Sequence, residues 1–137
     1  MPGYSGTPLP KKLGIKDQSR VRFIGTPTEV LSELKQSLAT CQFVTDGETD
    51  LDFAMYFTKS KAALTKEFAR LSRQLAPAGI FWVSWPKKSS GVKTDLDDNI
   101  VRDIGLAAGL VDVKVCAVTD VWSGLKFVRR LKDRRKY

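Results

Sequence analysis

The chain has 137 residues and a net charge of +8, and 42% of its residues are hydrophobic, so it suffices for one domain with a core of its own. It contains no histidine, which excludes histidine triads and imidazole metal ligands, and its two cysteines, Cys41 and Cys116, are too far apart for a paired metal or redox motif. No apolar run reaches the length of a membrane span and the first residues do not form a signal peptide, so we expect a soluble cytoplasmic protein.

Two helices and three short strands are predicted in the first half of the chain. Residues 7–14 have the marks of a short helix, with Thr7 as its N-cap and Gly14 as a left-handed stop. Residues 26–29 read Thr-Pro-Thr-Glu, a capping box, and the leucines that follow form one apolar stripe of a second helix. The expected strands are 20–25, 41–45 and 51–57. The last of them is almost wholly apolar, which is typical of a strand buried on both faces of a parallel sheet.

Two longer helices, one strand and a hairpin are predicted in the second half. The first helix ends at an Ala-Pro-Ala-Gly turn, residues 76–79, and an apolar strand follows. A polar loop then leads into a helix with Asp97 and Asp98 in its first turn, and two apolar runs joined by Thr119-Asp120 form a hairpin. The ranges are 59–75 for the first helix, 80–85 for the strand, 86–96 for the loop, and 110–118 and 121–131 for the hairpin strands.

Helices and strands alternate four times before the hairpin, which is the pattern of an α/β sheet with both faces covered. We therefore predict a single Rossmann-like α/β domain of three layers, whose mostly parallel sheet ends in a C-terminal antiparallel hairpin. The domain is expected to span residues 1–131, including the short N-terminal helix. A basic C-terminal tail is expected at residues 132–137.

Two stretches resemble class I methyltransferases that use S-adenosylmethionine. Residues 12–25 (KLGIKDQSRVRFIG) resemble the opening of that family, where a helix ending in Leu-Gly leads through a loop into the first strand and a glycine-rich turn. Residues 51–83 resemble its middle strand, helix, Pro-Ala-Gly turn and next strand, and the terminal hairpin also matches. The resemblance implies a shortened methyltransferase-like fold. The blocks GYSGTPLPKKLGIK, WPKKSSGVKTDL and KVCAVTDVWSGLKFV further resemble a bacterial family of unknown function.

The chain departs from the methyltransferases at the turn after the first strand. It has one glycine there, Gly25, where that family has several, Pro27 has no N–H to offer a ligand, and Glu29 is expected to fold back onto the cap. Asp46 follows about where an acidic residue for a ribose would stand. The chain then passes directly into the strand at 51–57, so one strand–helix unit is missing. From these departures we expect no S-adenosylmethionine and no other cofactor.

The polar segment 85–95 is the candidate ligand site, because it leaves the C-terminal end of a predicted central strand, where open α/β sheets hold ligands. Its ammonium and hydroxyl groups suit an anionic small molecule or a phosphate group, and the start of the last strand is expected to form a wall of the same crevice. The predicted ligand-binding residues are Trp85, Lys87, Lys88, Ser89, Ser90, Lys93, Trp122 and Ser123. The alternative is a solvated loop in which Thr94 caps the next helix and both tryptophans pack as core.

The two ends of the chain carry further candidates. Tyr4, Ser5 and Thr7 either close over the crevice as a lid or form a plain tail. Residues 126–137 hold seven basic residues and one acidic residue. Such a density of positive charge can bind phosphate groups without recognising a base sequence. Non-specific association with nucleic acid or an acidic protein is one expectation for this segment, and a solubilising tail is the other. Arg129 and Arg130 are expected on the last strand, where charge at a sheet edge also opposes aggregation.

No catalytic residue and no metal site is predicted. Asp95, Asp97 and Asp98 are explained by the start of a helix, and Cys116 stands within a strand, where a buried inert thiol is usual. Three functional hypotheses follow. The first is a non-catalytic module that binds an anionic small molecule at residues 85–95. The second is electrostatic association through the basic C-terminus, and the third is a divergent methyltransferase-like enzyme.

Overall fold

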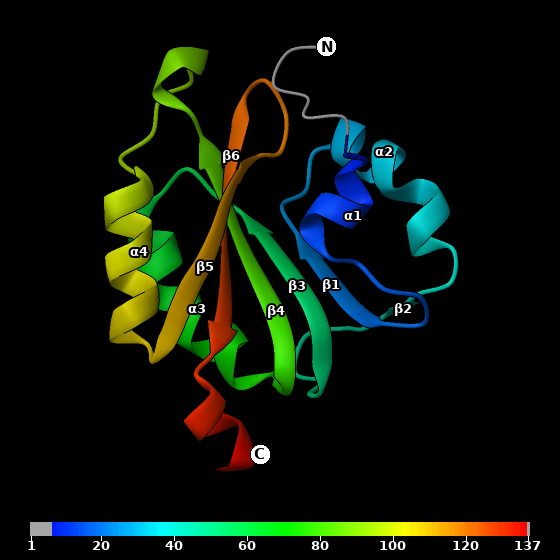
Figure 1. Ribbon diagram of the computed structural model, residues 1–137. Helices are drawn as coiled ribbons and strands as arrows, with labels where there is room; N and C mark the ends of the chain where they lie inside the picture. The colour runs from blue at the N-terminus through cyan, green and yellow to red at the C-terminus, as the bar shows by residue number, and fades with distance from the viewer. Residues whose placement is uncertain (1–6, 137) are drawn as a thin grey trace.

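The computed structural model describes residues 7–136, and it shows helices covering both faces of one six-stranded sheet (Figure 1). The strands are β1 (Arg20–Ile24), β2 (Gln42–Phe43), β3 (Leu51–Phe57), β4 (Leu75–Pro86), β5 (Leu110–Ala117) and β6 (Trp122–Arg129). The helices are α1 (Leu9–Leu13), α2 (Thr28–Leu38), α3 (Lys61–Arg73) and α4 (Asp98–Ala107), with 3₁₀ turns η1 (Lys88–Ser90) and η2 (Leu131–Lys136). In this part of the chain, no helix combines the length and the apolar character needed to cross a membrane.

The strand order of the sheet is β2-β1-β3-β4-β6-β5. β1 pairs in parallel with β2 and with β3, and β3 pairs in parallel with β4, whereas β6 is antiparallel to both β4 and β5. This confirms the predicted Rossmann-like domain with a mostly parallel sheet and a C-terminal antiparallel hairpin. After β1 the chain adds β2 on one side of it, and then returns to add β3 on the other side. The strand order therefore reverses between β1 and β3. Open α/β sheets bind ligands beyond the carboxyl ends of their strands at such a switch point.

The central strands fill an apolar layer on each face of the sheet. α1 and α2 cover the layer that contains Phe53, Met55 and Trp82, and α3 and α4 cover the layer that contains Phe81 and Phe127 (Figure 1). β3 is buried at six of its seven positions, which confirms the prediction of a strand covered on both faces. Apolar area removed from water on both sides of this strand is the main favourable term for the fold.

Residues 76–79, where the sequence predicts a turn, lie within the bounds of β4 and form a bulge there. Leu51 pairs with Leu75, and Phe53 pairs with Ile80, so the intervening residues of β4 bulge beside β3. A Cβ on Gly79 would lie 2.5 Å from the Leu51 carbonyl oxygen, so only glycine fits where the bulge passes β3. The four residues are folded tightly, because a Cβ on Gly79 would also lie 3.1 Å from the Ala76 carbonyl oxygen and 3.2 Å from the Ala76 nitrogen. The turn-like pattern of the sequence therefore forms a bulge inside the strand.

Three connections also differ from the sequence-based expectations. Asp97, and not Thr94, is the N-cap of α4, where its carboxylate accepts from the N–H of Ile100 (2.8 Å). The hairpin turn takes residues 118–121, and the hydroxyl of Thr119 accepts from two N–H groups of that turn and of β6. The predicted basic tail begins inside η2. The loop at 44–50 joins β2 directly to β3, in line with the missing strand–helix unit.

Candidate functional site

The carboxyl ends of β1, β3 and β4 meet at one edge of the sheet, and β6 begins there because Trp122 pairs with Pro86. At the end of β1, Gly25 has a φ of 67°, in the left-handed region that favours glycine. A Cβ at this position would lie 2.7 Å from the Phe57 carbonyl oxygen at the end of β3. The turn after β1 therefore needs a glycine both for its conformation and for its close approach to β3.

The start of α2, next to this turn, lacks the capping box that the sequence predicts. Pro27 is the N-cap, so the helix begins one residue late, and no side chain caps it. The hydroxyl of Thr26, which was expected to cap, is buried and has no hydrogen-bond partner among the described residues. The structure thus places an uncapped helix start and an unpartnered hydroxyl at the switch point. The sequence of residues 26–29 alone does not distinguish this arrangement from a capping box in which the side chains bond to the helix start.

Aromatic side chains line the same edge on the α1 and α2 side. Phe57 and Trp122 pack edge to face with their ring centroids 5.2 Å apart. Trp85 instead lies in the core layer beneath α3 and α4, because it pairs with Ser123 and successive residues of a strand point to opposite faces. The two tryptophans therefore do not form walls of one crevice, contrary to the prediction. Tyr4 and Ser5 of the suggested lid lie outside the described residues. Thr7, its third residue, precedes α1, whose N-cap is Pro8 and not Thr7 as predicted.

A cavity of about 370 Å³ beside the polar loop gathers half of the predicted ligand-binding residues. Those that line it are Trp85, Lys87, Lys88 and Ser123. Ser89, Ser90, Lys93 and Trp122 are not part of its lining. The carboxylates of Asp97 and Asp98 also line this cavity, so they offset the two ammonium groups there.

The polar groups of this loop are largely bonded within the protein. The Ser90 hydroxyl donates to the Lys87 carbonyl (2.6 Å) and the Thr94 hydroxyl donates to the Lys59 carbonyl (2.7 Å). The Asp95 carboxylate accepts from the first N–H of α3 (2.7 Å). The loop is therefore fixed against the start of α3. Its lysines, more than its hydroxyls, are the groups it can offer to an anion.

Asp46, the residue at the spacing of a ribose-binding acid, belongs to an ion-pair network on the α3 face of the sheet. Its carboxylate pairs with Arg22 of β1 (2.8 Å) and with Arg70 of α3, and Arg70 also pairs with Glu67 (2.7 Å). The hydrogen bond from Arg70, together with Arg22, lowers the pKa of Asp46 from 3.8 to about 2. The network ties the loop at 44–50 to the sheet and to α3.

Replacement of Asp46 by asparagine should remove an acid-sensitive part of the stability. Because the folded-state pKa of Asp46 lies below its unfolded value of 3.8, its ion pairs stabilise the fold fully above about pH 4 and are lost as the pH falls toward 2. We expect Asp46→Asn to lower the unfolding midpoint at pH 7 and to match the wild type near pH 2. Asp120→Asn, at an exposed position of the hairpin turn, is the control. A difference that is the same at both pH values would contradict the network.

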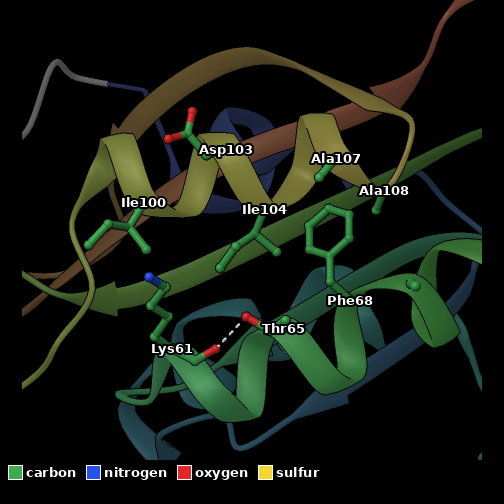
Figure 2. Close-up of a pocket in the computed structure, with 9 residues that line it drawn as sticks. Lys61, Thr65, Phe68, Ile100, Asp103, Ile104, Ala107 and Ala108 are labelled. Atoms are coloured by element: carbon green, nitrogen blue, oxygen red, sulfur yellow. Dashed lines mark hydrogen bonds between the residues drawn. The ribbon is translucent and has the colours of Figure 1, made fainter.

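An apolar groove of about 470 Å³ separates α3 from α4 (Figure 2). The side chains of Phe68, Ile100 and Ile104 point into the gap between the two helices, and Lys61 and Asp103 stand at its rim (Figure 2). The hydroxyl of Thr65 donates within α3, to the Lys61 carbonyl (2.8 Å). The groove offers apolar surface but no convergent set of polar groups, so its geometry indicates no chemistry.

The basic residues near the C-terminus whose side chains the structure describes do not all face solvent. Arg129 is buried, with 5% of its surface exposed, and its guanidinium donates to the carbonyls of Ser72 (2.6 Å) and Leu75 (2.9 Å). The expectation that it charges a sheet edge is wrong, because β6 lies between β4 and β5. Lys126 faces α1, and Arg134 of η2 donates to the Arg129 carbonyl (3.2 Å).

No protein-family model and no curated protein matches the chain. Among solved structures, magnesium protoporphyrin IX methyltransferase from Synechocystis PCC 6803 with bound SAM is similar, with a TM-score of 0.59 and 9% identity over 89% of this chain and 74% of that chain. A SAM-dependent methyltransferase from Aquifex aeolicus is similar with a TM-score of 0.56 and 15% identity over 85% of both chains. A putative type 11 methyltransferase from Sulfolobus solfataricus is similar with a TM-score of 0.54 and 16% identity over 89% of both chains. The chain therefore has the fold of these enzymes, and at such identities the likeness shows the fold alone.

The residues at the end of β1 fit the amino-acid end of S-adenosylmethionine. A carboxylate would accept hydrogen bonds from the uncapped start of α2 and from the buried hydroxyl of Thr26. Asp46 does not fit the ribose end, because two arginines hold its carboxylate on the α3 face. A ribose would therefore have to be held by other residues of this edge.

Proposed function

We propose that this chain is a divergent methyltransferase-fold protein that binds S-adenosylmethionine, or its demethylated product, at the switch point between β1 and β3. The observation that carries the proposal is the buried hydroxyl of Thr26, which has no hydrogen-bond partner among residues 7–136 and precedes an uncapped helix. A buried polar group without a hydrogen bond costs about 1–3 kcal/mol, and a helix start favours a negative charge. A ligand carboxylate at this point satisfies both groups at once.

The neighbouring residues are suited to the rest of such a ligand. When bound, S-adenosylmethionine supplies a methyl group on a positively charged sulfur atom. The aromatic pair of Phe57 and Trp122 offers ring surface at the same edge, and aromatic faces attract cations. Gly25 brings the turn after β1 close to the end of β3, without a side chain that would project between them. The role of these residues is to bind the ligand and to orient it.

Replacement of Thr26 by valine tests this proposal, because it removes the hydroxyl and keeps the shape. Saturation with either ligand at about 100 times its Kd should stabilise the wild type by about 2.7 kcal/mol, which raises the unfolding midpoint by several degrees. Thr26→Val should leave the unliganded protein as stable or more stable, since no described residue bonds to the lost hydroxyl. We expect its affinity, measured by calorimetry, to fall about tenfold, as for the loss of one hydrogen bond to a charged group.

The matched control is Thr65→Val on α3, whose hydroxyl donates to the Lys61 carbonyl (2.8 Å) on the far face of the sheet. Its affinity for both ligands should equal that of the wild type. The proposal fails if neither ligand stabilises the wild type at millimolar concentration. It also fails if the two threonine variants weaken binding to the same extent.

The polar loop is a second candidate, favoured by the cavity that Lys87 and Lys88 line with Ser123. Here the chain would be a non-catalytic module that holds an anionic small molecule. The same titration separates the two candidates when inorganic phosphate replaces the nucleoside ligands. A phosphate response that Lys87→Ala and Lys88→Ala remove, and that Thr26→Val leaves intact, would favour the loop.

A further inference from the structure

Three lysines gather on the α1 side of the β5–β6 hairpin. Lys114 of β5 is directly opposite Lys126 of β6 in the register of the sheet. Lys16, which follows α1, lies close enough to Lys126 to act on its charge. We refer to Lys16, Lys114 and Lys126 as the lysine cluster. Like charges directly opposite one another on neighbouring strands destabilise a sheet, so the cluster needs an explanation.

The end of α1 packs against the lysine cluster. The Lys114 ammonium donates to the Lys12 carbonyl (3.1 Å). A Cβ on Gly14 would lie 3.7 Å from the Lys126 nitrogen, so this ammonium rests against the left-handed turn that ends α1. Cys116 belongs to the same side of the sheet, and burial raises the pKa of its thiol. The thiol therefore stays neutral and supplies no negative charge to the cluster.

Carboxylates do not balance the lysine cluster within residues 7–136, where none forms an ion pair with any of the three lysines. Asp17 and Asp52 line a cavity of about 320 Å³ together with Lys16, but each is already bonded. Asp17 accepts from the Thr40 hydroxyl (3.3 Å), and Asp52 accepts from the N–H of Arg20 (2.9 Å). Each carboxylate thus has a partner other than the cluster.

Lys126 is the member of the lysine cluster whose ammonium group most needs a negatively charged partner. It is half-buried, and no described residue accepts a hydrogen bond from its ammonium. Burial lowers the pKa of Lys126, and the charges of Lys114 and Lys16 lower it further. A half-buried ammonium among like charges is unfavourable unless a negative charge joins it. The same three groups would then become donors of charge-assisted hydrogen bonds.

We propose that the lysine cluster is a binding site for a phosphate group carried by a small molecule. One phosphate accepts hydrogen bonds from several ammonium groups at once, which gives Lys126 a partner and removes the repulsion across the strands. A compact phosphate suits the site better than a nucleic-acid backbone, because backbones are held by charges spread along a surface. The site lies on the α1 side of the sheet, whereas the cavity of the polar loop lies on the α4 side. It is also separate from the switch point, and S-adenosylmethionine has no phosphate.

Inorganic pyrophosphate is the probe, titrated into the full chain at an ionic strength held constant with potassium chloride. We expect it to raise the unfolding midpoint of the wild type by several degrees at millimolar concentration. Lys126→Met keeps the apolar stem and removes the charge, so it should raise the midpoint of the unliganded protein and weaken pyrophosphate binding at least tenfold. Lys66→Met, at an exposed position of α3, is the control and should change neither quantity.

Several outcomes would overturn the proposal. One is the absence of any effect beyond that of chloride at the same ionic strength, and another is an equal response of Lys126→Met and Lys66→Met. A pyrophosphate response lost in Lys87→Ala, but kept in Lys126→Met, would move the site to the polar loop. A short DNA duplex that binds through Lys126, while pyrophosphate does not, would replace the small ligand by a nucleic acid.

Discussion

Replacing Gly105 by alanine should lower the free energy of unfolding by about 2 kcal/mol, although alanine is the better helix former by about 1 kcal/mol. Gly105 is buried in α4, where the helix lies against β6. A Cβ there would lie 2.1 Å from Cε1 and 2.6 Å from Cζ of Phe127. The Phe127 ring is fully buried, and the ring of Phe68 packs on it edge to face with 5.1 Å between centroids. Phe68 blocks one side of the ring, so the ring or α4 must shift to admit the new methyl group.

A double-mutant cycle with Phe127→Leu, followed by urea unfolding, checks this explanation. The smaller side chain makes room for the new methyl group, so the two changes together should cost at least 1 kcal/mol less than the sum of the single changes. Leu106→Ala, at the neighbouring exposed position, should change stability by less than about 0.5 kcal/mol. If Gly105→Ala raises the stability, helix propensity outweighs packing, and the position of the Phe127 ring against Gly105 is wrong.

The strands and the fold class were predictable because burial on both faces leaves a local trace in the sequence. The run 51–57 is apolar at almost every position, and such a run between helices is typical of a parallel sheet. The segment at 76–79 was not predictable in the same way. Its Ala-Pro-Ala-Gly residues favour a turn, which forms as a bulge, and only the pairing of Leu75 with Leu51 shows that β4 begins before it.

The candidate site was less predictable, because its geometry depends on strand register and on partners far away in the chain. Trp85 and Trp122 are both near the carboxyl edge, but the pairing of Trp122 with Pro86 puts them on opposite faces. Lys114 and Lys126 are twelve positions apart in the sequence, and a bulge in β5 decides that they stand opposite one another. Thr26 matches a capping motif, yet the late start of α2 leaves its hydroxyl unpartnered.

Among the C-terminal basic residues whose side chains the structure describes, Arg129 should be the most costly to replace, because it is the one that the fold buries. Its guanidinium donates to the carbonyls of Ser72 and Leu75, which are 57 and 54 positions away in the chain. The Ser72 carbonyl lies in the last turn of α3, where C=O groups lack helical partners and the macrodipole is negative, and the Leu75 carbonyl belongs to the first residue of β4. Arg129→Met should destabilise the protein by about 2–4 kcal/mol, since it leaves two buried carbonyls without donors.

Two further variants separate this role from the charge of the C-terminal segment. Arg129→Lys keeps the charge but not the forked guanidinium, so its stability should fall between those of the wild type and Arg129→Met. Arg130→Met removes the same charge at an exposed position and should change the free energy of unfolding by less than about 0.5 kcal/mol. Equal effects of the methionine variants at 129 and 130, measured in urea at two salt concentrations, would mean that net charge matters and the buried contacts do not. The expected difference would instead show that a residue from the most basic part of the chain serves the fold, because its guanidinium joins the end of α3 to the start of β4 through two carbonyls.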